Sequence, residues 1–169
     1  MWEPLRRFRA LEPNARGLFL RAAALLPLVS FSLRLRGFRS TQASLQKRIG
    51  GAVSSGCDTS DPSDPARGAH AALTARMVRS AALRNLGSAT CLEKSLVLWW
   101  LLGRQGIDSS VRIGARKTGQ KFEAHAWVEC DGVVLNEPEE THKHYAAFDE
   151  AFPVLRWQKN GGKHRGTCR

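Results

Sequence analysis

Apolar residues recur at helical spacing through the first part of the chain, and at a spacing of two further on. The first pattern predicts that residues 3–48 are helical. Within it, a helix is expected over residues 16–35, where Pro27 leaves room for a kink and Gly37 ends the pattern. Residues 40–48 can add a short third helix. The N-terminal part is therefore expected to be a helical arm.

Two further helices are predicted after a stretch that has no apolar period. Residues 50–65 are rich in Gly, Ser, Asp and Pro, which indicates a linker. Residues 66–86 show one apolar stripe at helical spacing. Residues 90–103 are apolar on nearly all sides, which is typical of a helix at the centre of a core. We expect Trp99 and Trp100 on this last helix to be packing residues.

The period of two begins after Gly106 and predicts an antiparallel sheet. Residues 109–116 alternate, and residues 121–130 alternate more clearly. The Asp-Gly pair at 131–132 is a strong hairpin signal, with residues 133–137 as the returning strand. Helices followed by a small antiparallel sheet define an α+β fold.

Composition narrows the class of protein without naming its chemistry. The 169 residues are 43% hydrophobic, with a mean hydropathy of -0.31. That content excludes a disordered chain and a protein with many membrane spans, and it suits one compact domain. The apolar run over residues 18–33 is interrupted by Arg21 and Pro27, so we expect a buried or surface-lying helix and leave peripheral membrane contact open.

The positive charge is concentrated at the N-terminus. The formal net charge is +11, and residues 1–50 hold ten basic and two acidic residues, which accounts for +8 of it. Such an end suits an acidic partner, an anionic membrane surface or nucleic acid. Nucleic-acid binding would need a basic face with interleaved aromatic residues. The arginines of residues 1–50 could form one, but we do not expect it.

Cysteine and histidine spacing argues against metal or cofactor chemistry. The four cysteines are far apart and form no C-x-x-C pair, which favours a reduced cytoplasmic compartment. His142 and His144, with the acidic residues before them, fit no standard ligand set. No phosphate-binding loop is present in the sequence. We therefore expect neither a metal nor a cofactor.

Cys91 heads the most apolar of the predicted helices. Thr90 and Glu93 form a Thr-x-x-Glu capping box before the apolar run, which places Thr90 at the N-cap and Cys91 at the first helical position. A thiolate there is stabilised by backbone N–H groups and by the positive end of the helix dipole. The same N–H groups can bind an oxyanion. The position suits a nucleophile, although free cysteine is also a common core residue.

His125 lies in the middle of the second predicted strand and is the candidate base. The hairpin register decides which polar residue can orient its ring. A two-residue turn makes Asn136 its diagonal neighbour on the same face, whereas a three-residue loop with a bulge places Glu137 directly opposite. We prefer Glu137, because a carboxylate also stabilises the imidazolium. A purely structural histidine remains the alternative.

Two segments resemble a known family. TCLEKSLVLWWLLGRQGIDSSVRIG, followed by FEAHAWVECDGVVLNE, is similar to the lasso peptide biosynthesis B2 proteins, which are transglutaminase-like cysteine proteases that remove the leader of a ribosomally made precursor peptide. The resemblance implies a transglutaminase-like (papain-like) protease core. It implies Cys91 as nucleophile, His125 as base and Glu137 as the acid, where the family usually has Asp.

The resemblance also implies an organisation and partners. We expect a helical arm over 1–49, a linker over 50–65, a catalytic domain over 66–155 and a basic tail over 156–169. The arm is too short for a winged-helix domain, so the leader-binding (B1-type) protein is expected to be a separate partner, and the lasso cyclase to use the product. A transglutaminase-like acyltransferase and a non-catalytic interaction protein are the alternatives.

Overall fold

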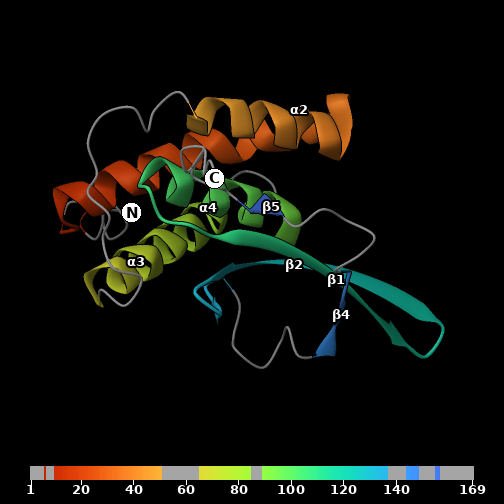
Figure 1. Ribbon diagram of the computed structural model, residues 1–169. Coiled ribbons are helices and arrows are strands. Elements are labelled where there is room, and N and C mark those ends of the chain that lie inside the picture. The colour runs from red at the N-terminus through yellow and green to blue at the C-terminus, as the bar shows by residue number, and fades with distance from the viewer. Residues whose placement is uncertain are drawn as a thin grey trace, which may run out of the picture.

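The fold consists of a helical layer against an antiparallel sheet, which confirms the predicted α+β class (Figure 1). It is seen in a computed structural model that describes residue 6 and residues 10–50, 65–84, 89–136, 144–148 and 155–156. The helices are α2 (Pro13–Gly50), α3 (Pro65–Ala82) and α4 (Cys91–Arg104). The strands are β1 (Ser110–Thr118), β2 (Lys121–Cys130), β3 (Val133–Val134), β4 (Ala146–Ala147) and β5 (Leu155–Arg156).

Helix α2 reverses direction at Gly37. Gly37 is its only residue with non-helical dihedral angles, at φ 72° and ψ 178°. The hydroxyls of Ser32 and Thr41 are 2.9 Å apart, although nine residues of straight helix would separate them by about 13 Å. The two arms therefore lie side by side as a helical hairpin (Figure 1). The predicted end at Gly37 is confirmed, and the helix continues through Pro27.

Length and composition alone would allow α2 to cross a membrane. Residues Pro13–Ile49 meet both requirements, which the core helices of soluble proteins and signal sequences also meet. In this fold the inner side of α2 packs into the core, and 22% of its most apolar 18-residue stretch is buried.

Helix α4 is the centre of the core, as its apolar sequence predicts. It contacts α2, α3 and the sheet, and Trp99 is fully buried within it. Leu26 and Ile49, one from each arm of α2, belong to the same cluster of buried side chains. The predicted helix end at Gly103 is wrong by one residue, since α4 continues to Arg104. The lack of a side chain at Gly103 instead admits Ile49, whose Cδ1 would lie 3.1 Å from an added Cβ.

The sheet has the order β3-β2-β1-β4, with β5 also paired to β1. Strands β1 and β2 form a regular hairpin from Ser110 opposite Glu129 to Thr118 opposite Lys121. Val128 and Cys130 belong to the helical core. Because side chains alternate along a strand, His125 lies on the opposite face of the sheet.

The turn between β2 and β3 decides between the two registers left open by the sequence. Asp131 has φ 50° and Gly132 has φ 80°, and Cys130 pairs with Val133. Two consecutive left-handed residues make a two-residue hairpin turn that matches the twist of the strands. The bulged register, which would place Glu137 directly opposite His125, is therefore wrong.

Several predictions lie outside the described residues. These are most of the first helix before residue 10, the linker over 51–64, Gly87, Glu137 itself and the tail from 157 onward. The domain boundaries at 49, 65 and 155 stay a prediction.

Gly114 sits where three elements come close together. It pairs with His125 on β2 and with Ala147 on β4. A Cβ added to it would lie 2.9 Å from the carbonyl oxygen of Ala146 and 3.0 Å from Tyr145 Cβ. The first of these atoms is backbone, so β4 would have to move.

We expect Gly114→Ala to lower the free energy of unfolding by about 1–3 kcal/mol, because the added methyl group overpacks the β1–β4 contact. Urea unfolding measures this change. The matched control is Gly68→Ala, because an added Cβ there has no neighbour within 4 Å and removes a helical glycine from α3. It should stabilise by about 0.5–1 kcal/mol. A Gly114→Ala variant as stable as the wild type would contradict the packing described above.

Candidate active site

Cys91 is the first residue of α4, behind a complete capping box. The Glu93 N–H donates to Thr90 Oγ1 at 3.3 Å, and the Thr90 N–H donates to Glu93 Oε2 at 2.7 Å. Both halves of the predicted box are thus confirmed. The Cys91 thiol is half-buried and free. The sequence position that suits a nucleophile is therefore realised in the fold.

The carboxylate of Glu93 also joins this helix start to the N-terminal arm. Ser30 Oγ on α2 donates to Glu93 Oε1, the oxygen that the capping box leaves over. Glu93 is buried, and a buried carboxylate is costly unless hydrogen bonds satisfy it. Two donors from different elements supply those bonds, so α2 helps to fix the residue that caps Cys91. No motif in the sequence points to Ser30 as a partner of Glu93.

His125 is half-buried on β2 and is held between aromatic rings. Its ring lies 6.3 Å from the Trp127 ring at 22° and 5.1 Å from the Tyr145 ring at 32°. Trp127 is fixed in turn, since its Nε1 donates to Glu129 Oε1 at 2.8 Å. Arg112 Nε donates to the other oxygen of Glu129 at 3.0 Å. The strand therefore presents His125 in a defined orientation.

A buried polar network joins α4 to the edge of β2. Ser95 Oγ donates to the carbonyl oxygen of Ala126 at 3.0 Å. Asn136 Nδ2 donates to Ser95 Oγ at 3.0 Å, and the Val128 N–H donates to Asn136 Oδ1 at 2.8 Å. Ser95 is a further site residue that was not predicted from the sequence. Its signal was a hydroxyl four residues after Cys91 in an otherwise apolar run.

The network fixes Ser95, four residues after Cys91 on α4, against β2 at Ala126. Helix α4 ends at Arg104 and β1 begins at Ser110, whose partner Glu129 lies at the far end of β2. The start of α4 therefore points toward the earlier residues of β2. Cys91 lies four residues before Ser95 on α4, a distance of about 6 Å along the helix axis. About two residues of a β-strand cover the same length. Cys91 is thus one turn of α4 before the residue that contacts Ala126.

The structure brings the two elements together without a hydrogen bond at the sulfur. Within the part of the chain that is described, Cys91 Sγ has no hydrogen-bond partner. His125 is on the sheet face opposite the helical core, and the contact that relates it to Cys91 is the bond from Ser95 to its neighbour Ala126.

The third member of the predicted triad is not placed by the structure. Glu137 lies outside the described residues, and β3 ends three residues before it. Asn136, the alternative, uses both ends of its amide to bond Val128 and Ser95. Asn136 therefore links helix α4 to strand β2.

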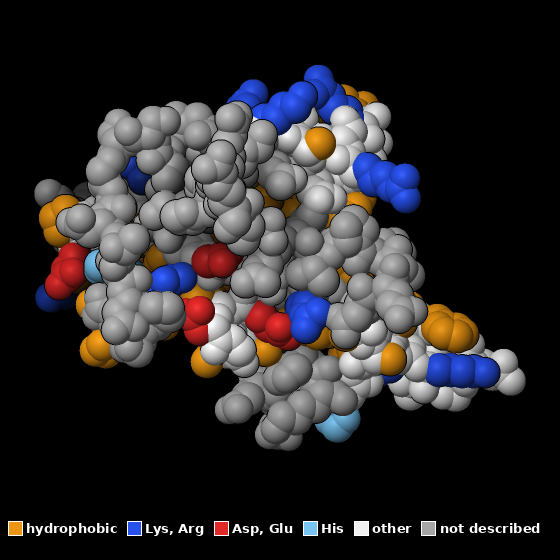
Figure 2. All heavy atoms as spheres, viewed as in Figure 1, with side chains coloured by type: hydrophobic (Ala, Val, Ile, Leu, Met, Phe, Trp, Pro, Cys, Tyr) orange, Lys and Arg blue, Asp and Glu red, His pale blue; other side chains and the backbone are white. Residues whose placement is uncertain are grey.

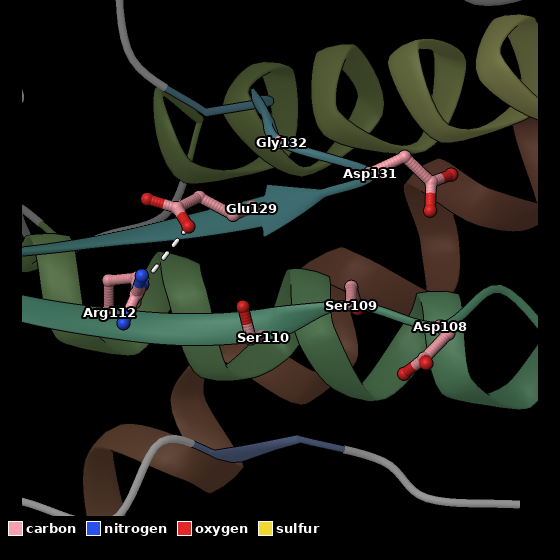
Figure 3. Close-up of a pocket in the computed structure, with 7 residues that line it drawn as sticks. All are labelled: Asp108, Ser109, Ser110, Arg112, Glu129, Asp131 and Gly132. Atoms are coloured by element: carbon pink, nitrogen blue, oxygen red, sulfur yellow. Dashed lines mark hydrogen bonds and ion pairs between the residues drawn. The ribbon is translucent and has the colours of Figure 1, made fainter. Parts of the chain in front are cut away.

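A separate polar hollow opens further along the sheet. Its volume is about 450 Å³, and Figure 3 shows Arg112 and Glu129 pointing toward each other across it. Glu129 is four residues from His125 along β2, or about 13 Å. The hollow is therefore distinct from the start of α4. Its lining residues are Asp108, Ser109, Ser110, Arg112, Glu129, Asp131 and Gly132. Among the described residues, no three His, Cys, Asp or Glu side chains group as metal ligands.

Cys130 contrasts with Cys91 in its surroundings. Its Sγ is buried and donates to the carbonyl oxygen of Asp108 at 3.3 Å. Burial, followed by the negative charge of Asp131, raises the pKa of the Cys130 thiol to about 11. A thiol that stays protonated is a poor nucleophile, so Cys130 is a structural cysteine.

These features agree with what comparison of the sequence with known families finds. A family model described as Transglutaminase-like superfamily matches residues 25–148, and the chain belongs to that superfamily. The superfamily includes the lasso peptide B2 proteases, and its members are typically thiol enzymes of the cysteine-protease or acyltransferase type. No curated protein and no solved structure matches the chain. The match begins inside α2, so the family's own fold includes part of the helical hairpin.

The raised pKa of Cys130 predicts a pH dependence of stability. In the unfolded chain the thiol ionises near 9.0, whereas in the fold it keeps its proton to about 11. The unfolded state therefore loses its proton first, and the free energy of unfolding falls as the pH rises from about 9 toward 11. Between pH 8 and 10.5, the stability difference between wild type and Cys130→Ala should shrink by about 2 kcal/mol in urea unfolding. A difference that stays constant would contradict the assignment.

Proposed function

We propose that the protein is a cytoplasmic cysteine peptidase that removes the leader from a ribosomally made precursor peptide during lasso peptide biosynthesis. The observation that carries the proposal is the position of Cys91, first on α4 and one turn before the residue that bonds β2 beside His125. The resemblance of the segments around these residues to the B2 proteins supplies the substrate class.

The start of α4 supplies what a nucleophile and an oxyanion need. The capping box uses the N–H of Glu93, and the Lys94 N–H donates to the Thr90 carbonyl. Within the described helix start, this leaves the N–H groups of Cys91 and Leu92 directed outward at the positive end of the dipole. They lie next to the sulfur, which is where an oxyanion forms in acyl transfer.

The reaction proceeds through a thioester. In the structure the His125 ring lies on the sheet face away from the helical core, so the proposed step requires it to turn toward α4. It then takes the proton of Cys91, and the sulfur attacks the carbonyl carbon at the junction of leader and core. The N–H groups of α4 hold the oxyanion. The carbon–nitrogen bond then breaks, and His125 returns the proton to the leaving amine of the core peptide. Water, deprotonated by His125, attacks the thioester and releases the leader as a carboxylic acid with the thiol restored.

Glu137 is our proposal for the group that orients His125; it rests on the resemblance, because the observed turn excludes the register that would place Glu137 directly opposite His125. Asn136 is occupied at the α4–β2 junction, and a carboxylate stabilises the imidazolium that forms in each step. Glutamate can reach further than the aspartate usual in the family, because it has one more methylene.

The partners follow from the same resemblance and are part of the proposal. A separate winged-helix (B1-type) protein would bind the leader and deliver the junction to Cys91. The lasso cyclase would then act on the freed core. We propose hydrolysis of the thioester and not acyl transfer, because the family that these segments resemble does not imply an acceptor amine.

The test is cleavage of a lasso precursor peptide that carries both leader and core, in the presence of a leader-binding protein. Cys91→Ala and His125→Ala should each lower the cleavage rate by at least about 1,000-fold, because each removes a group that takes part in bond making. Product masses measure the rate and distinguish the leader acid from a product with an added amine.

Cys130→Ala is the matched control and should cleave within about twofold of the wild type, since Cys130 lies at the other end of β2. Circular dichroism checks that each variant is folded. Cleavage that survives in folded Cys91→Ala would refute the enzymatic proposal, and a mass gain on an acceptor amine would replace hydrolysis by transfer.

A further inference from the structure

The first arm of α2 is apolar on both sides, and only one side is covered. Leu18, Ala22, Leu26 and Val29 are buried in the core. Four large apolar side chains of the same arm are exposed instead, and we refer to them as the outer stripe: Leu20 (57% exposed), Leu28 (63%), Phe31 (63%) and Leu35 (67%).

The four residues of the outer stripe lie on one side of the helix. At 100° per residue, their positions fall within an arc of about 80°, centred opposite the buried positions. Single exposed apolar residues are ordinary, but four at this spacing make one continuous strip. Such a strip on a stable helix is expected to be covered by a partner or a lipid surface.

The charge around the outer stripe has one sign. From Pro13 to Gly50 the sequence holds seven Lys and Arg residues and no Asp or Glu. Arg21 and Arg34 are exposed and fall on the two sides of the stripe by helical angle. Figure 2 shows Lys and Arg side chains gathered over α2, with apolar side chains between them.

We propose that the outer stripe of α2 docks the protein on an anionic lipid bilayer, with the helix lying in the membrane surface. The apolar side chains would enter the boundary between headgroups and acyl chains, and the arginines would contact lipid phosphates.

A bilayer fits this surface better than a protein does. Protein interfaces have few charged residues at their centre, whereas a membrane of anionic lipids presents a uniformly negative plane that suits a surface with charges of one sign. A helical hairpin without a single acidic residue complements such a plane over its whole length. The inner side of α2 stays in the core, so docking requires no unfolding of the helical layer.

The experiment is co-sedimentation of the full chain with vesicles of phosphatidylglycerol and phosphatidylcholine, and with vesicles of phosphatidylcholine alone. We expect at least tenfold tighter binding to the anionic vesicles, and weaker binding as the salt concentration rises. The double variant Leu28→Glu/Phe31→Glu should lose at least tenfold of that binding. Leu83→Glu is the matched control, because Leu83 is also an exposed large apolar residue (82%) but lies after α3. This variant should bind as the wild type does.

Other outcomes overturn the proposal. One is the absence of binding to anionic vesicles. Another is binding that the double variant leaves unchanged although circular dichroism shows the wild-type fold. Binding that resists 1 M salt and alkaline extraction would mean that the helix spans the bilayer. A further outcome is that the wild type does not bind vesicles but binds the leader-binding protein, and that the double variant loses this binding. The outer stripe would then be the docking surface for that protein. None of these results depends on Cys91, so the peptidase proposal is tested separately.

Discussion

The hydroxyl of Ser95 joins the helix that carries the candidate nucleophile to the strand that carries the candidate base. It donates to the Ala126 carbonyl, and β3 pairs only with residues 129 and 130 of β2. The Ala126 carbonyl therefore lies on a part of the β2 edge that β3 does not cover. A buried hydroxyl or carbonyl without a partner costs about 1–3 kcal/mol, so each group holds the other in place. Asn136 completes the network from the other side and fixes the same edge.

A second set of contacts connects α2 to α4, the helix that carries Cys91. Ser30 reaches Glu93, whose other oxygen caps the backbone at Thr90, and Ile49 fills the space beside Gly103 at the opposite end of α4. Helix α4 is thus held at both ends by α2. The same helix carries the outer stripe on its far side, so one element serves both the start of α4 and the surface we propose for the membrane.

The parts of the fold that depend on neighbouring residues could be predicted from the sequence. The capping box at Thr90 and Glu93 needs only a spacing of three, and the turn at Asp131 needs only the preference of two residues for positive φ. The contacts of Ser95 could not be predicted, because they join residues 31 and 41 positions apart. The choice of the bulged register failed for the same kind of reason, since it was made to bring Glu137 to His125 and not from the turn itself.

The central claim is that Cys91 and His125 act on each other, and the alkylation rate of Cys91 tests it without any substrate. The rate at which iodoacetamide labels Cys91 at pH 7 is measured by peptide mass mapping in the wild type and in His125→Gln. The control variant is His70→Gln, because His70 is exposed on α3. The account predicts that His125→Gln slows the labelling of Cys91 by at least about tenfold while His70→Gln leaves it unchanged. Equal rates in the wild type and a folded His125→Gln variant would contradict it.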